Sequence, residues 1–370
     1  MAINIKEIQE KLIKKICEYK ETVRIMHICG THERTIVKHG LRHILPKNIK
    51  LLSGPGCPVC VTPIEDIDFA IALAESGIVV SSFGDMFRVP GTSNNLFDVK
   101  SNGATVKMVY GINDAIKFAK NNPERQVVFF GIGFETTAPM NAVELLKKPP
   151  KNFSIISSHK IVPPAMDLLI SDISVDAFIA PGHVSTIIGT YPYKPYADKG
   201  FPIVVAGFEA YDLLLSIYMI LKQIQSNSSK VENAYPRAVC KEGNLKAQEL
   251  VNLVFEVVDS NWRGIGVIEK SGLGLKNEFK EFDAISKYSA IYKSVLNNIK
   301  KKGTNGNLNC MCAMILTAKA DPTECSIFGI ECTPKNPVGP CMVSMEGTCY
   351  NWYKYSKEGT IAQSITENVL

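Results

Sequence analysis

The stretch VRIMHICGTHERTIVKHG, residues 23–40, runs from an apolar segment into Cys29, a glycine and the polar side chains of Thr31, His32 and Glu33. A short run that is apolar throughout is typical of a strand buried on both faces. Threonine is a good residue for the start of a helix, and helical spacing follows it here. The stretch therefore predicts a strand, a turn that carries a thiol, an imidazole and a carboxylate, and then a helix.

This strand–turn–helix pattern recurs from residue 22 to about residue 225. Such alternation predicts an α/β fold, with parallel sheets covered by helices on both faces. The predicted strands are VRIMHI, IKLLSG, GIVVSS, TVKMVY, QVVFFGIG, FSIISS, AFIAPG and PIVVAGF. The predicted helices include TIVKHGLRHIL, PIEDIDFAIALAES, INDAIKFAKN, APMNAVELLKK and PPAMDLLIS.

We predict two similar α/β domains followed by a smaller cysteine-rich domain. An amphipathic helix over residues 1–20 comes first, because its isoleucines and leucine recur at helical spacing. The stretch KKPPKN marks a break between one α/β domain at 21–148 and a second at 149–230. The last domain, 231–370, is expected to combine a helix (NLKAQELVNLVFEVV), a glycine-rich turn (WRGIGVIEKSGLGL) and loops that carry six cysteines.

Bulk composition narrows the classes of function. The 370 residues are 46% hydrophobic and 21% charged, and the net charge of +5 is spread along the chain, which does not indicate nucleic-acid binding. No apolar run reaches the roughly 18–20 residues of a membrane helix. The N-terminal pattern does not indicate a signal peptide, so we expect a cytoplasmic protein. Eleven cysteines in such a chain favour metal or redox chemistry over disulfide scaffolding.

Polar or glycine-rich motifs follow six of the predicted strands: CGTHE, GPGCPVC, FGD, GFETTAP, PGHVS and GFE. Ligands of open parallel sheets bind outside the carboxyl ends of the strands, so these motifs are expected to line one cleft. GFETTAP lacks the lysine of a Walker motif and is interpreted as a helix start that receives a small anionic group. The side chains expected to line the cleft are Thr31, Asp85, Glu135, Thr136, Thr137, His183 and Glu209.

GPGCPVC contains the pair Cys57 and Cys60, a spacing used both by redox dithiols and by metal sites. A helix start follows it and favours the thiolate form. Together with Cys29 and His32, the pair would form a soft site suited to iron or zinc. His32 or Glu33 is a candidate proton carrier. The alternative is that Cys29 is buried filler while its neighbours merely cap the helix.

The strongest chemical signal is the tail, where six of the 11 cysteines lie between residues 310 and 349. Zinc ribbons prefer two close cysteine pairs, whereas well-spaced cysteines among glycine and proline suit a [4Fe–4S] cluster. Cys310 and Cys312 form a close pair that could act as a dithiol beside the cluster. Spacing does not decide which four of the six bind iron, and a structural zinc site is the alternative. The well-spaced quartet is Cys325, Cys332, Cys341 and Cys349.

The ordered set CGTHE, GPGCPVC, FGDMFRVPG, GFETTAP, PGHVS, VAGFE and CTPKNPVGPCMVSMEGTC, spread over about 22–353, resembles the HypD family of hydrogenase maturation proteins. This resemblance implies a third domain with a [4Fe–4S] cluster, held by the well-spaced quartet, and a dithiol at Cys310 and Cys312. It implies that Cys29 is a ligand of an Fe(II) ion that becomes Fe(CN)2CO, and that Cys57 and Cys60 line the same cleft as a redox pair or further ligands. Ala313 departs from the family pattern, which has glycine after the second cysteine of the pair.

The resemblance also implies partners: a small HypC-type chaperone that supplies another thiolate, and a HypE-type protein that donates cyanide. The chain would be a monomer within a heteromeric complex, a scaffold with redox and cyanide-transfer activity. A second interpretation is a [4Fe–4S]-dependent thiol–disulfide reductase, which would not need Cys29 and His32. A third is a zinc-binding interaction module.

Overall fold

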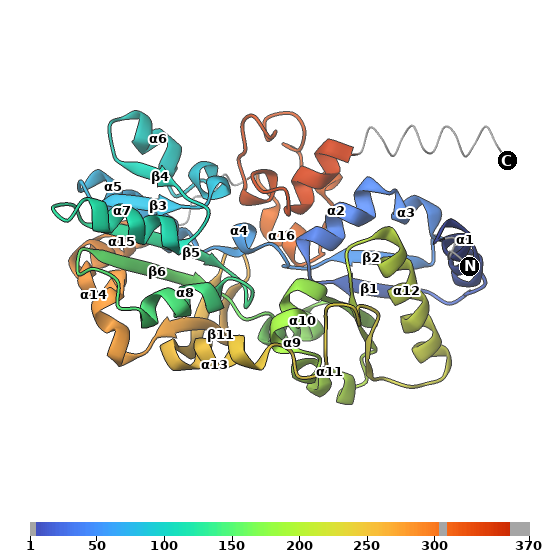
Figure 1. Cartoon of the computed structure of the whole chain (residues 1–370). Coiled ribbons are helices and arrows are strands. Elements are labelled where there is room, and N and C mark those ends of the chain that lie inside the picture. Colours follow the sequence, from blue (N-terminus) through green and yellow to red (C-terminus); the bar gives the residue numbers. More distant parts are fainter. Residues whose placement is uncertain (1–4, 303–308, 356–370) are drawn as a thin grey trace.

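Two parallel β-sheets form the framework of the structure, a computed structural model that describes residues 5–302 and 309–355. Sheet A has the strand order β2-β1-β7-β8-β9 and sheet B the order β4-β3-β5-β6. Figure 1 shows the two sheets toward opposite ends of an elongated molecule. The strands of the two sheets are β1 (Val23–His27), β2 (Ile49–Ser53), β3 (Val79–Ser82), β4 (Val106–Met108), β5 (Val127–Gly133), β6 (Phe153–His159), β7 (Ala177–Pro181), β8 (Ile203–Ala206) and β9 (Val231–Asn233).

The central strands are buried from end to end. Every residue of β5, β7 and β8 is buried, which explains why these segments are apolar without alternation. Each of the eight predicted strands is present, and β9 adds a short parallel strand at the edge of sheet A. The predicted α/β class with parallel sheets is confirmed.

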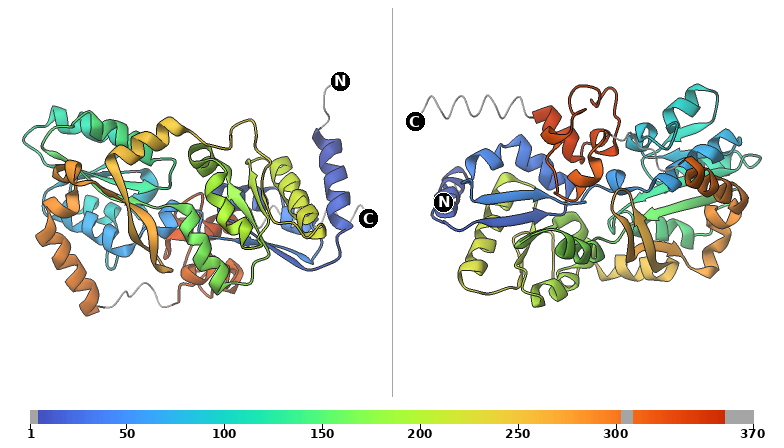
Figure 2. Two further views of the ribbon diagram at one scale, coloured as in Figure 1. Left: turned by 90° about the horizontal axis from the view of Figure 1, so that it is seen from below. Right: turned by 180° about the vertical axis from the view of Figure 1, so that it is seen from behind.

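Helices cover both sheets, as the views in Figure 2 show. On sheet A, α1 packs on α12, which lies against β7 and β8; on sheet B, α5 and α7 lie against β3 and β5. The helices are α1 (Ile5–Cys17), α2 (Gly30–Lys38), α3 (Leu41–Ile44), α4 (Pro58–Val61), α5 (Ile64–Glu75), α6 (Leu96–Ser101), α7 (Ile112–Asn121), α8 (Ala138–Leu146), α9 (Val162–Asp172), α10 (Gly182–Ile188), α11 (Lys194–Asp198), α12 (Ala210–Gln225), α13 (Leu245–Val254), α14 (Ala284–Lys287), α15 (Ser289–Lys302) and α16 (Cys312–Leu316).

The predicted boundary at 148/149 is wrong. Strands β5 and β6 lie on either side of it, yet they are adjacent parallel strands of sheet B. Sheet A in turn pairs β1, from the start of the chain, with β7. The chain therefore begins in sheet A, builds sheet B, and returns to sheet A, so the sheets do not correspond to 21–148 and 149–230. Residues 1–4, 303–308 and 356–370 of the predicted domains lie outside the described residues.

A second correction concerns the region after residue 245. The predicted helix ends at Val254, and the chain then forms an antiparallel hairpin of β10 (Phe255–Trp262) and β11 (Gly266–Leu275) where a longer helix and a glycine-rich turn were expected. The first strand reads FEVVDSNW, and its middle is exposed, so it lacks the apolar run of the buried strands. Hairpin strand β11, α13, α14 and α15 pack on elements of the sheet B half, and so they do not belong with the cysteine-rich tail.

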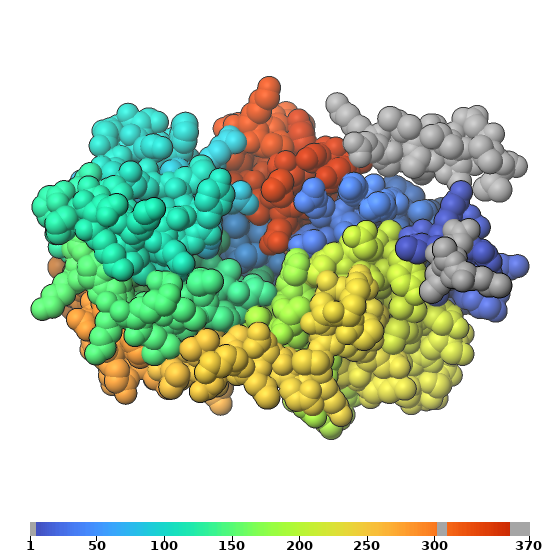
Figure 3. Space-filling model, in the orientation of Figure 1, coloured from blue at the N-terminus to red at the C-terminus, as the bar shows by residue number. Residues whose placement is uncertain are grey.

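The cysteine segment, residues 309–355, lies over the junction of the two sheets, as Figure 3 shows in red. It contains the short helix α16, 3-10 turns at Pro322–Glu324 and Pro340–Met342, and a helical stretch over 348–355, and otherwise consists of turns and loops. Its position places the tail cysteines beside the loops at the carboxyl ends of the strands. In the described ranges, no helix has both the length and the apolar character needed to cross a membrane.

Candidate functional site

Cys29 and the GPGCPVC loop meet at the carboxyl edge of sheet A. Cys29 follows β1 and stands at the start of α2, and Cys57 follows β2 and stands at the start of α4. The Gly30 amide donates a hydrogen bond to the Gly56 carbonyl at 3.0 Å. A Cβ at Gly56 would lie 2.2 Å from the Cys29 nitrogen, so only glycine allows this approach. The two motifs were predicted to lie at the same edge of a sheet, and they are in direct contact there.

The cysteine segment closes over Cys29. A Cβ at Gly30 would lie 2.3 Å from the Glu346 carbonyl oxygen, and the Thr31 hydroxyl donates to the Glu346 carboxylate at 3.2 Å. Burial, and secondly the Glu346 carboxyl, raise the pKa of the Cys29 thiol to about 12. Asp85, at the end of β3, adds to the rise in the pKa of Glu346 that burial causes. Thr31 and Glu346 therefore form a polar group beside a neutral, buried thiol, and Asp85 lies near enough to affect the charge of Glu346.

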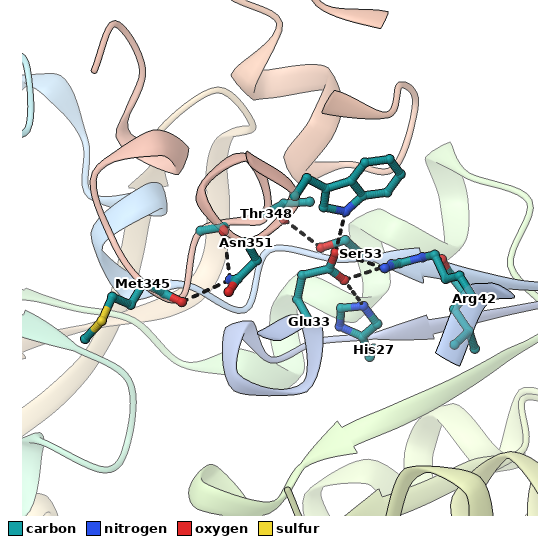
Figure 4. A network of polar contacts seen from close by, with 10 residues as sticks. His27, Glu33, Arg42, Ser53, Met345, Thr348 and Asn351 are labelled. Carbon is teal, nitrogen blue, oxygen red and sulfur yellow. Dashed lines mark hydrogen bonds and ion pairs between the residues drawn. The ribbon is translucent and has the colours of Figure 1, made fainter. Parts of the chain in front are cut away.

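Glu33 is the centre of a buried network that ties the cysteine segment to sheet A (Figure 4). Arg42 binds both carboxylate oxygens at 3.0 and 2.8 Å, His27 lies 2.8 Å from one of them, and the Trp352 indole donates to the other at 2.6 Å. Burial by itself would raise the pKa of Glu33, but Arg42 and His27 outweigh burial and hold it well below its usual range. This saturated carboxylate favours an anchoring role over that of a proton carrier.

Figure 4 also shows a second tie between sheet A and the cysteine segment. The hydroxyls of Ser53, at the end of β2, and Thr348 lie 2.7 Å apart. The Asn351 side chain donates to the carbonyls of Met345 and Gly347, both at 2.9 Å, and so fixes the turn that carries Glu346. These bonds hold Glu346 in place above Cys29.

The two predicted cleft histidines flank the same aromatic ring. His32 is fully buried, its Nε2 lies 3.3 Å from the Ala206 carbonyl, and its ring lies 5.3 Å from that of Phe208. The exposed ring of His183 stacks on Phe208 at 3.8 Å. Burial lowers the pKa of His32 to about 3, so this imidazole is neutral at pH 7. Neutral His32 can accept or donate a hydrogen bond, but it does not carry a positive charge toward Cys29.

The GFETTAP loop contributes a second buried carboxyl. Glu135 accepts a hydrogen bond from the Val162 amide at 3.0 Å, while its Oε2 has no partner among the described residues. Burial raises its pKa to about 7. Thr136 is exposed, and Thr137 donates to carbonyls of its own loop, at Ile132 and Phe134. These threonines therefore do not reach the Cys29 group.

Glu209 follows Phe208 in the chain and caps a helix. It is exposed and forms a capping box at the start of α12 with Asp212. Its place in the predicted cleft stays a prediction. The buried Tyr193, which the sequence did not indicate, is close enough to both Glu135 and Cys29 for their charges to contribute to the rise in its pKa that burial causes.

Cys57 and Cys60 are joined as a disulfide. While the disulfide is formed, neither sulfur is a free thiolate that could bind a metal. A disulfide is the oxidised form expected of a redox dithiol, one of the two uses predicted for this pair. Cys60 is fully buried, and its sulfur lies 4.0 Å from the Pro340 carbonyl. Cys60 lines a cavity together with Cys310 and Cys312, so the two predicted dithiols adjoin.

All six cysteines of the tail line one small cavity, which we call the cysteine cavity. Gly339 closes it, since a Cβ there would lie 2.7 Å from the Cys310 sulfur. The sulfurs of Cys312 and Cys341 are 2.8 Å apart, and the Val338 amide donates to the Cys332 sulfur at 3.4 Å. As positioned in the described ranges, no three His, Cys, Asp or Glu side chains are arranged to hold a single metal ion. The cavity members are Cys310, Cys312, Cys325, Cys332, Cys341 and Cys349.

Sequence reasoning missed the anchors that lie far apart in the chain. Arg42, Trp352 and Tyr193 belong to none of the quoted motifs at the strand ends. Glu346 lies inside the quoted motif CTPKNPVGPCMVSMEGTC, three residues before Cys349. This closeness to a candidate ligand is the one sequence signal that could have identified Glu346 as a site residue. The partner of Glu346, Thr31, is 315 residues away in sequence, and sequence spacing does not reveal such pairs.

Comparison with known proteins identifies the family of the chain. The family model described as "HypD: Hydrogenase formation hypA family" matches residues 4–356. A putative hydrogenase expression/formation protein of Methanocaldococcus jannaschii is 48% identical over 351 residues, which cover 93% of this chain and 95% of that protein. Hydrogenase maturation factors HypD of Escherichia coli and Azotobacter vinelandii are 42% and 40% identical, covering 91% and 92% of this chain and 90% and 91% of theirs. The chain belongs to the HypD family of hydrogenase formation proteins.

Proposed function

We propose that this protein is a hydrogenase maturation factor that holds an iron ion at Cys29 while cyanide and carbon monoxide are added to it. The observation that carries the proposal is the convergence of three features at one edge: a buried thiol, a disulfide loop in contact with it, and a cysteine-lined cavity beside that disulfide. Soft thiolate ligands suit iron that also binds cyanide and carbon monoxide.

Cys29 would bind the iron as a thiolate and lose its proton on binding, because metal ligands must be deprotonated. Its raised pKa means that the free site holds the thiol in the neutral form until a cation arrives. Glu346, held by Thr31, is the carboxylate placed to accept that proton. His32 is neutral and fully buried. The iron with its cyanide and carbonyl ligands is the cargo of this site.

The cysteine cavity fits a [4Fe–4S] cluster by the chemistry of its donors, since it gathers six thiols, five of them buried, in one place. When bound, such a cluster supplies one electron at a time. By the family resemblance, its ligands would be Cys325, Cys332, Cys341 and Cys349, which leaves Cys310 and Cys312 as a dithiol. The adjoining Cys57–Cys60 disulfide would take up two electrons and two protons to become a pair of thiols.

The resemblance supplies the partners in this proposal. A HypC-type chaperone would add a second thiolate to the iron, and a HypE-type protein would donate cyanide. We place the protein in the cytoplasm, as a monomer within that heteromeric complex.

Cys29→Ala and Cys29→Ser test the proposal, with Cys240→Ala as the matched control because Cys240 is exposed and outside the cavities described above. Each variant is co-expressed with the maturation partners and purified without oxygen. We expect both Cys29 variants to lose the iron that is not part of a cluster and to support no active hydrogenase, while the control retains both. Unchanged iron content or normal hydrogenase activity in the Cys29 variants would contradict the proposal.

A second candidate function is a [4Fe–4S]-dependent thiol–disulfide reductase. The observation that favours it is the shared cavity of Cys60, Cys310 and Cys312, which places two dithiols next to each other. A reductase of this kind would remain active in Cys29→Ala and lose activity in Cys60→Ala.

A further inference from the structure

The turn of the β10–β11 hairpin is inserted between the disulfide helix α4 and the cysteine segment. The Arg263 amide donates to the carbonyl of Val61, the last residue of α4, at 2.9 Å. On the other side, a Cβ at Gly264 would lie 2.8 Å from the Ala313 Cβ, and Gly264 has a φ of +76°. The predicted glycine-rich turn therefore lies between the segment that carries Cys57 and Cys60 and the segment that carries Cys310 and Cys312.

The Arg263 side chain lines a cavity beside cysteines. Its guanidinium donates to the Pro90 carbonyl at 2.8 Å, and the residue lines the same cavity as Cys60, Cys310 and Cys312. Burial lowers the pKa of Arg263, and Cys312, Cys310, Cys341 and, with the smallest effect, Asp68 oppose that lowering. Among the described residues, the arginines that form ion pairs with carboxylates are Arg42 and Arg237, and Arg263 is not one of them.

The positive charge of Arg263, withdrawn from water in this cavity, is stabilised by a negative charge nearby. Arg263 is partly buried. Arginine does not lose its proton in proteins, and a charge withdrawn from water without a counter-charge is costly. The one carboxylate that shares the cavity, Glu65, accepts a hydrogen bond from Asn261 at 2.6 Å. Asp68, another nearby acid, is bound by Thr92 through its amide and its hydroxyl. Both carboxylates keep their charge under these hydrogen bonds, but the cysteine sulfurs raise the pKa of the Arg263 guanidinium more than Asp68 does.

We propose that Arg263 is a counter-charge for Cys310 and Cys312, which line both its cavity and the cysteine cavity, and that it raises the reduction potential of the iron–sulfur cluster held in the cysteine cavity. This inference rests on the proposed function, because it takes the cysteine cavity to hold a [4Fe–4S] cluster. Reduction adds one negative charge to a cluster, and a fixed positive charge nearby stabilises the reduced form more than the oxidised form. Arg263 is thus a positioning residue that acts on electron transfer through its charge.

The test is a redox titration of the full chain, purified without oxygen, in which the reduced cluster is followed by electron paramagnetic resonance. Arg263→Gln removes the charge and keeps a hydrogen-bond donor for Pro90, and Arg263→Lys keeps the charge. Arg88→Gln is the matched control. The exposed Arg88 also donates to carbonyls of the cysteine segment, at Pro334 and Lys335, but it does not line the cavity of Cys60, Cys310 and Cys312.

We expect the reduction potential to fall in Arg263→Gln, to remain near the wild-type value in Arg263→Lys, and to be unchanged in Arg88→Gln. Loss of the cluster from Arg263→Gln but not from Arg263→Lys would support the counter-charge, whereas loss from both variants would overturn it, because the lysine variant keeps the charge. An unchanged potential in a cluster-replete Arg263→Gln protein would overturn this inference and leave the proposed function standing. A colourless wild-type protein without a cluster signal would overturn both the cluster and the role of Arg263.

Discussion

Two buried glutamates, Glu33 and Glu135, follow central strands of the two sheets, and their surroundings are opposite. Glu33 has a hydrogen-bond or ion-pair partner for both oxygens, from Arg42, His27 and Trp352. Glu135 has the Val162 amide at one oxygen and no partner at the other within the described residues. The pKa of the first lies well below its usual range, and that of the second rises to about 7. The pKa of a buried carboxyl that follows a strand is therefore determined by the groups that bind its oxygens, and not by its position after the strand.

The largest effect in this comparison is expected for Glu33→Ala. Removing the partner of a buried ion pair typically costs about 3–5 kcal/mol, because the remaining charge is left unpaired. We expect a loss of that size in the free energy of unfolding by urea, and faster proteolysis within residues 309–355. Glu209→Ala is the control, because that exposed carboxylate only caps α12 and should cost about 1 kcal/mol. Equal losses in the two variants would refute the anchoring role.

The next effect separates the two glutamates by pH. The folded state raises the pKa of Glu135 from its ordinary 4.5 to about 7, so the folded protein binds the proton more tightly than the unfolded chain. Its contribution to stability is therefore complete below about pH 4.5 and is lost as the pH rises through 7, by about 3 kcal/mol in total. In Glu135→Gln this contribution should be absent from the pH profile of urea unfolding, so stability should fall less between pH 4.5 and 7 than in the wild type, while the contribution of Asp66, whose pKa burial raises to about 6, remains.

Glu33→Gln is the matched variant for that experiment. Because the pKa of Glu33 is held low in the folded state, its contribution is present above the ordinary pKa of 4.5 and is lost toward acid. This variant should therefore change the acid side of the profile and leave the slope between pH 4.5 and 7 as in the wild type. A Glu135→Gln protein that keeps the wild-type slope would show that Glu135 is not the titrating group.

The smallest effect is expected for Trp352→Phe. The change removes one hydrogen bond to the Glu33 carboxylate and keeps an aromatic ring near the Arg42 guanidinium, which lies 5.4 Å from the Trp352 ring centre. A hydrogen bond to a charged group is worth about 1.5–3 kcal/mol, and we expect a loss in the lower part of that range because Arg42 and His27 still hold Glu33. A loss as large as that of Glu33→Ala would mean that the indole, and not the ion pair, anchors the cysteine segment.

The local fold was predictable because each buried strand carries its own signal. Segments such as QVVFFGIG and AFIAPG are apolar at nearly every position and end in glycine, so neither their type nor their edges depended on distant partners. Strand order was not predictable in the same way. Nothing in β1 specifies that it pairs with β7 rather than with β3, and this is why the boundary at 148/149 failed. The exposed hairpin strand β10 lacks such an apolar run and was missed.

The site was predictable to the extent that its residues are cysteines in tight motifs. Cys29, the Cys57–Cys60 pair and the six tail cysteines all lie where the motifs suggested, at strand ends or around one cavity. Residues whose role depends on a distant partner were not predictable. The charge on Arg263 acquires a role only because a hairpin turn brings it beside Cys310 and Cys312, and Glu33 changes from candidate proton carrier to anchor only once Trp352 reaches it.

The measurement that tests the central claim most directly is an infrared spectrum of the protein, co-expressed with its maturation partners and purified without oxygen. Metal-bound cyanide and carbon monoxide absorb in a window free of protein bands. We predict bands of both ligands in the wild type and in Cys240→Ala, and none in Cys29→Ala. A cluster-replete, partner-bound wild-type sample without such bands would contradict the claim that iron is assembled at Cys29, and would favour the reductase.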